Sequence, residues 1–100
     1  METKKQVQEI LVLYQEKLKK KVFGKEIFSA DSLHPSQHQS LLHAKWMIEQ
    51  ALLFLENPEK KQQTQRWLGF LQGILWCCGV YTINQLRDHT TKIFQNHKTR

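Results

Sequence analysis

Apolar side chains recur at intervals of three and four residues near the start of the chain, and this spacing constrains the fold more than any other feature. Because an α-helix turns about every 3.6 residues, such side chains share one face. The spacing predicts a helix over residues 4–23, with Thr3 and Gln6 as a capping box and Gly24 ending it. The stripe consists of Val7, Ile10, Leu11, Tyr14, Leu18 and Val22.

Three further helices are predicted over residues 37–56, 57–78 and 83–97. Ser36 and Thr82 are each followed three residues later by glutamine, which is the pattern of a capping box. Asn57 suits an N-cap, and since it alone separates the second and third helices, these should form an antiparallel hairpin. We therefore expect residues 1–100 to form one all-α domain, a compact bundle of about four helices.

Other apolar residues are expected to join the core. In the connector over residues 25–35, Ile27, Phe28 and Leu33 should pin the chain to the helices. Leu53 should widen the buried side of the second helix. The third helix should bury one face, made of Trp67, Leu68, Phe70, Leu71, Ile74 and Leu75.

The chain is basic, with 15 lysine and arginine residues against 9 acidic residues and a formal net charge of +6. This surplus favours anionic partners, although a solvated basic surface has the same composition. Lys20 and Lys21 lie three and four residues after Lys17 and so share a face of the predicted first helix. That face is the expected contact for phosphates if the protein binds nucleic acid.

The segment from Arg66 to Trp76 departs from ordinary helix composition because it contains two glycines, Gly69 and Gly73. Each glycine costs about 1 kcal/mol relative to alanine, and residues four apart stack on one helix face. The missing side chains predict a shallow groove. Either a neighbouring helix, from this chain or from a second copy, or a flat ligand should lie against it.

The residues around this groove are suited to a phosphate-bearing ligand with an aromatic base. Arg66 provides a planar donor fork for phosphate, and Trp76 provides a stacking surface. The predicted ligand-binding residues are Arg66, Gly69, Gln72, Gly73 and Trp76, joined by His43, Lys45 and Trp46 from the preceding helix.

Catalysis is not expected, because the sequence has no paired-carboxylate, phosphate-loop or nucleophile motif. No cofactor is expected, and no histidine or cysteine spacing indicates a metal site. Cys77 and Cys78 are adjacent and unsuited to a mutual disulfide, which favours a reduced, cytoplasmic setting. No apolar run approaches the roughly 20 residues that span a bilayer, so no membrane partner is expected.

The run from Arg66 to Trp76 resembles a motif in small uncharacterised helical proteins of tailed phages. The resemblance covers residues 40–90 and implies a phage accessory protein. Short helical phage proteins include some that sequester nucleotide signals of host immunity, so we expect such sequestration in the cytoplasm of an infected cell. The matching positions outside the run are Lys45-Trp46-Met47, Glu59-Lys60, Gly79, Tyr81 and residues 83–89.

Two other functions remain open from the sequence. The aromatic and glycine surface would also suit an inhibitor or adaptor that docks on a host protein, and the lysine face would suit a nucleic-acid binder. Three tryptophans in 100 residues, together with a small core, favour a homo-oligomer, either a dimer or a higher even assembly.

Overall fold

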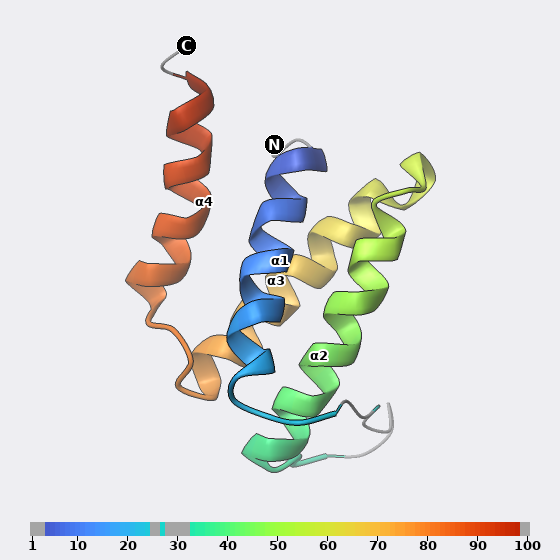
Figure 1. The fold of residues 1–100 in the computed structure, drawn as a ribbon, viewed down its shortest axis with the longest axis vertical. Coiled ribbons are helices and arrows are strands. Elements are labelled where there is room, and N and C mark those ends of the chain that lie inside the picture. Colours follow the sequence, from blue (N-terminus) through green and yellow to red (C-terminus); the bar gives the residue numbers. More distant parts are fainter. Residues whose placement is uncertain (1–3, 25–26, 28–32, 99–100) are drawn as a thin grey trace.

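The computed structural model describes residues 4–24, 27 and 33–98. Within these ranges the chain is helical and contains no β-strand. The predicted fold class, an all-α bundle of about four helices, is confirmed (Figure 1). The elements are α1 (Lys4–Lys19), α2 (Gln37–Phe54), the short 3-10 helix η1 (Pro58–Lys60), α3 (Lys61–Cys77) and α4 (Ile83–Lys98).

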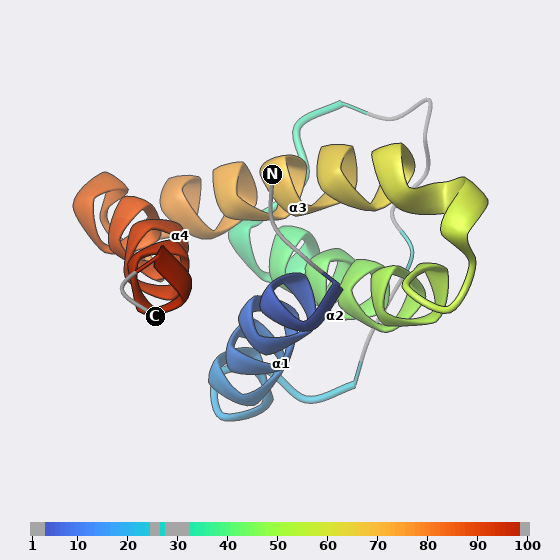
Figure 2. The same cartoon turned by 90° about the horizontal axis from the view of Figure 1, so that it is seen from above.

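The helices follow one another around the bundle. α2 packs against α1 and α3, and α4 closes the arrangement by contacting both α3 and α1. The chain reverses direction between α2 and α3, so these helices form the predicted hairpin (Figures 1 and 2). Figure 2 also shows α1 and α2 on the same side of α3, with α4 at its far end.

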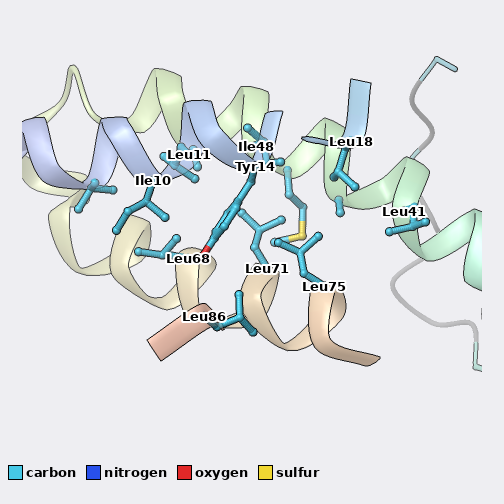
Figure 3. Packing of buried hydrophobic residues seen from close by; sticks show 14 of the residues in the cluster. Ile10, Leu11, Tyr14, Leu18, Leu41, Ile48, Leu68, Leu71, Leu75 and Leu86 are labelled. Carbon is cyan, nitrogen blue, oxygen red and sulfur yellow. The ribbon is translucent and has the colours of Figure 1, made fainter. Parts of the chain in front are cut away.

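The core lies between α1, α2 and α3, and α4 adds Leu86 to it (Figure 3). Every residue of the apolar stripe predicted for the first helix is buried. Burying a leucine or isoleucine side chain contributes about 1.5–3 kcal/mol, so this stripe is a main source of stability. The largest fully buried side chains are Tyr14, Ile10, Leu11, Leu18, Ile48, Leu71, Leu75 and Val7.

Side-chain caps set the starts of α2 and α4 as predicted. The Ser36 hydroxyl accepts the Gln39 backbone N–H at 3.0 Å, and the Gln39 side chain accepts the Ser36 N–H at 2.9 Å. Thr82 and Gln85 make the equivalent pair at 3.1 and 2.8 Å. The proposed cap at Thr3 lies outside the described residues.

The hairpin between α2 and α3 differs from the prediction. Asn57 does act as a cap, accepting the Glu59 backbone N–H at 3.0 Å, but the helix that it starts is η1. The Lys60 N–H bonds to the Asn57 carbonyl at 2.9 Å, which closes a tighter turn with a spacing of three residues. The α-helix therefore begins at Lys61 rather than at Asn57.

Gly79 ends α3 as its position in the sequence indicates. Its φ of +74° is in the left-handed region that glycine adopts without strain. This turn lets the Val80 N–H reach back to the Leu75 carbonyl at 2.8 Å, which satisfies a carbonyl of the last helical turn.

The first helix is shorter than predicted, because α1 ends at Lys19 and a turn follows. The Lys21 N–H bonds to the Leu18 carbonyl at 2.9 Å, three residues back, and Val22 still reaches the core. The run of three lysines has no apolar side chain to bury, so nothing holds further turns in place. Lys20 and Lys21 consequently do not share a helix face with Lys17.

Several apolar residues predicted to be core are exposed. Ile27 and Leu33 of the connector are 60% and 79% exposed, so they do not anchor it, and Phe28 lies outside the described residues. Leu53 on α2 and Phe70 on α3 are 65% and 60% exposed. These helices already bury Ala51, Leu68 and Leu71 against their neighbours, and the exposed residues lie on the opposite sides.

Candidate ligand-binding site

The α2–α3 hollow is an open depression of about 370 Å³ on the outside of the hairpin. It brings together Arg66 from α3 with His43 and Trp46 from α2, three of the residues predicted to bind a ligand. This volume is at the lower end of the range of known small-molecule sites. The lining residues are His43, Trp46, Met47, Arg66, Trp67 and Phe70.

The α3–α4 hollow is a second depression, of about 310 Å³, between α3 and the start of α4. It contains the other predicted residues of the glycine segment, Gln72, Gly73 and Trp76, and it adds Arg87 from α4. The remaining lining residues are Ile83, Leu86 and Thr90.

The structure therefore does not bring Arg66 and Trp76 into one groove. They are ten residues apart on α3, which corresponds to about 15 Å along the helix axis. Each belongs to a different hollow. A single small ligand on one chain would contact one of them but not both.

Aromatic rings form a continuous series along the α2–α3 hollow. The His43 and Trp46 ring centroids lie 5.4 Å apart, and the Trp46 and Trp67 centroids lie 5.9 Å apart. Phe54 meets Trp67 edge-on at 4.9 Å, and the Lys60 ammonium lies 5.1 Å from the Phe54 ring centre. These distances are typical of favourable aromatic packing, so the indole rings are held in place before any ligand arrives.

Arg66 is the only permanently charged residue among those that line the α2–α3 hollow. Partial burial lowers the pKa of His43 below its usual value, so the imidazole is neutral at pH 7. A neutral imidazole has one donor and one acceptor nitrogen, whereas the exposed Arg66 guanidinium offers only donors. The hollow thus combines one fixed cation with apolar rings.

Lys45 is the predicted site residue that the structure places away from both hollows. Its ammonium donates to the Val22 carbonyl at 2.9 Å and so ties α2 to the end of α1. Gln72 also has a partner within the fold, because its side-chain amide donates to the Tyr14 hydroxyl at 3.1 Å.

Gly69 and Gly73 have no neighbour in this chain that requires their small size. Nothing among the described residues lies within 4 Å of a Cβ placed at either position. One explanation for the glycines, the close packing of another helix of the same chain, is therefore wrong. A second copy or a ligand remains.

Four lining residues were absent from the predicted site. Trp67, Met47 and Phe70 are apolar, and sequence periodicity does not distinguish an apolar residue that lines a surface hollow from one in the core. Arg87 belongs to a helix that folds back onto α3 through a turn, and no pattern in its own segment indicates that approach.

In the described part of the chain, no group of three histidine, cysteine or acidic residues is arranged to hold a metal ion. Likewise, none of the described helices is long and apolar enough to cross a membrane. Cys77 and Cys78 are both free thiols. Comparisons with protein-family models, with curated proteins and with solved structures found no significant match.

Proposed function

We propose that this protein binds, without chemical change, a small molecule that carries both a phosphate group and an aromatic base. The α2–α3 hollow is the proposed site. The observation that carries this proposal is the convergence of Arg66 with the paired rings of Trp46 and Trp67 in that hollow.

In this proposal the Arg66 guanidinium donates to phosphate oxygens while the base stacks on an indole ring. His43, neutral at pH 7, offers one donor and one acceptor to the edge of the base. A hydrogen bond to a charged group contributes about 1.5–3 kcal/mol, and stacking of one base contributes about 1–3 kcal/mol. These sum to at most about 6 kcal/mol, whereas a micromolar Kd corresponds to about 8 kcal/mol. Micromolar binding therefore requires a further contact.

The resemblance of the Arg66–Trp76 run to phage proteins supports a biological setting for this binding. We propose that the protein is phage-encoded and sequesters a nucleotide signal of host immunity in the cytoplasm of the infected cell. Sequestration requires only affinity and sufficient protein, so no catalytic residue is needed. A homo-oligomer would supply several binding sites in one assembly.

A thermal-shift screen against linear and cyclic nucleotides tests this function. A ligand present at 100 times its Kd stabilises the folded state by about 2.7 kcal/mol, which raises the melting temperature of a domain of this size by several degrees. Arg66→Ala should abolish the shift while leaving the ligand-free melting temperature unchanged, because the side chain is exposed.

Arg87→Ala is the matched control, because it removes an exposed arginine from the other hollow. This variant should retain the full shift. Absence of a shift with any nucleotide, or an equal loss in both variants, would refute binding in the α2–α3 hollow.

The same screen separates the rival functions. A nucleic-acid binder would show steep salt dependence with long DNA or RNA. The lysine face expected for that role is not formed, since α1 ends at Lys19 and the Lys17 ammonium lies 5.5 Å from the Tyr81 ring centre. An inhibitor of a host protein would show neither response, but the exposed rings of Phe70 and Trp76 would bind its target.

A further inference from the structure

The outer face of α3 is unusual because it is exposed yet almost uncharged. Phe70 and Trp76 are 60% and 51% exposed there, and Arg66 is the only charged residue. Figure 2 shows α1 and α2 on the opposite side of α3. Exposed apolar patches of this kind mark interaction sites more often than solvated surface. The outer face consists of Gln62, Arg66, Gly69, Phe70, Gly73, Trp76 and Cys77.

Four residues on this face are spaced symmetrically along the helix. From Arg66 to Gly69, to Gly73 and to Trp76 the steps are three, four and three residues, and this order of steps is the same from either end. A two-fold axis at the level of residue 71 would therefore relate Arg66 to the level of Trp76, and Gly69 to the level of Gly73. Such self-complementarity is what a two-fold dimer interface requires.

We propose that a second copy of this chain docks on the outer face of α3, with the two α3 helices antiparallel about that axis. Each Arg66 then lies against the partner subunit's Trp76, and each Gly69 lies opposite the partner subunit's Gly73. The space next to both glycines is open, so the two backbones can approach closely.

The charges on α3 favour this antiparallel register. The first half of α3 carries Lys61 and Arg66, whereas the second half carries no charged side chain. Antiparallel pairing places each guanidinium over an electron-rich indole, an attractive cation–π contact, and places the cationic half near the negative end of the partner helix dipole. Parallel pairing would set Arg66 against the same residue of the partner.

This pairing also completes the proposed ligand site, and in that respect it rests on the proposed function. Arg66 lines the α2–α3 hollow, so the partner subunit's Trp76 would stand at the edge of the hollow. A guanidinium stacked on an indole keeps its N–H donors in its own plane, free to bind phosphate. The second indole is the further contact that micromolar affinity requires, and it brings arginine and tryptophan together across two chains.

A charge exchange across the interface tests the pairing. Sedimentation equilibrium of the ligand-free protein should give twice the 12.0 kDa mass of one chain. Trp76→Arg sets two guanidinium groups against each other and should raise the dimer Kd about tenfold or more. Adding Arg66→Trp restores the contact with its two sides exchanged, and should return the Kd towards the wild-type value. A monomeric wild type, or a double variant as weak as the single one, would overturn the proposal.

Gly73→Glu provides an independent test that does not depend on Trp76. The position is exposed with open space beside it, so the folded chain should accept the change and keep its helical circular dichroism. The dimer should dissociate, whereas Asn84→Glu, the same charge change at an exposed position on α4, should leave it intact. Dimerisation of Gly73→Glu with wild-type affinity would overturn the pairing.

These measurements are made without ligand, so the two proposals fail separately. An intact dimer that binds no nucleotide refutes the proposed function alone. Nucleotide binding by a protein that stays monomeric refutes the α3 pairing alone.

Discussion

The two hollows beside α3 contain similar residues but differ in how their walls are held. Each pairs an exposed arginine with tryptophan, Arg66 with Trp46 and Trp67 in one, and Arg87 with Trp76 in the other. The α2–α3 hollow lies between two helices that share the core and a continuous series of ring contacts. The α3–α4 hollow has as one wall a helix that contributes Leu86 alone to the described core.

A buried hydroxyl compensates for the small apolar contact of α4. The Tyr14 hydroxyl lies 3.1 Å from His89 Nδ1 on α4 and accepts the Gln72 amide from α3. Burial raises the pKa of Tyr14 to about 12, so the hydroxyl stays protonated and donates to a neutral His89. The comparison teaches that similar lining residues can rest on different support: one hollow depends on apolar packing, the other on a hydrogen-bond chain.

The largest effect should come from the core residue beneath both hollows. Leu71 on α3 is fully buried, and Leu71→Ala should lower the free energy of unfolding by about 2–5 kcal/mol through lost burial and a residual cavity. Urea denaturation measures this, and both hollows should lose protection from hydrogen exchange together. Loss on one side only would show that the hollows do not share a core.

Tyr14→Phe should weaken the α3–α4 side selectively. The ring still fills its place in the core, but Gln72 and His89 each lose a hydrogen-bond partner, at a cost of about 1–3 kcal/mol. Hydrogen exchange should accelerate in α4 and remain close to wild type in α2. Equal acceleration in both helices would mean that this hydroxyl does not support α4 in particular.

Acid should have a smaller effect on stability, acting through one histidine in each hollow. Burial lowers the pKa of His43 and, despite the opposing effect of Asp88, that of His89. The unfolded chain therefore takes up protons first, so stability is complete above about pH 6.5 and declines as the pH falls below it.

Urea titrations between pH 7.5 and 5 measure this decline, with pH steps chosen around the histidine range. His89→Gln should remove the part that belongs to the α3–α4 side, and His43→Gln the part that belongs to the α2–α3 side. If the variant lacking both histidines declines as steeply as the wild type, other groups govern the acid response.

Phe70→Ala should have the smallest effect on the stability of the monomer, within about 0.5 kcal/mol, because the ring is exposed. Its effect should instead appear in binding, since Phe70 lines the α2–α3 hollow and lies on the outer face of α3. Calorimetry with any nucleotide found in the screen measures it. A stability loss as large as that of Leu71→Ala would contradict the assignment of Phe70 to a surface.

Much of the fold follows from local chemistry in the sequence. The stripe from Val7 to Val22 needs only helical periodicity to be recognised, and the caps at Ser36 and Thr82 involve partners three residues away. The end of α1 was less predictable, because a lysine run is compatible with a helix and only the lack of anything to pack against ends it.

The candidate site was predictable in its chemistry but not in its grouping. Sequence spacing places Arg66, Gly69, Gly73 and Trp76 on one face of α3, and that face is exposed as expected for a groove. Spacing along one helix does not reveal which other helix supplies the second wall. Trp67 illustrates this, since its ring partners Trp46 and Phe54 come from α2.

The sequence by itself determined the helices, their caps, the apolar stripe of α1 and the uncharged outer face of α3, since each depends on residues within a few positions of one another. Only the tertiary structure separated Arg66 from Trp76 into two hollows and tied Lys45 to Val22. It also joined Tyr14 to Gln72 and His89, which are 58 and 75 positions away. The physical reason is that helix periodicity fixes a side chain's direction about its own axis, whereas its neighbours depend on how whole helices pack around a shared core.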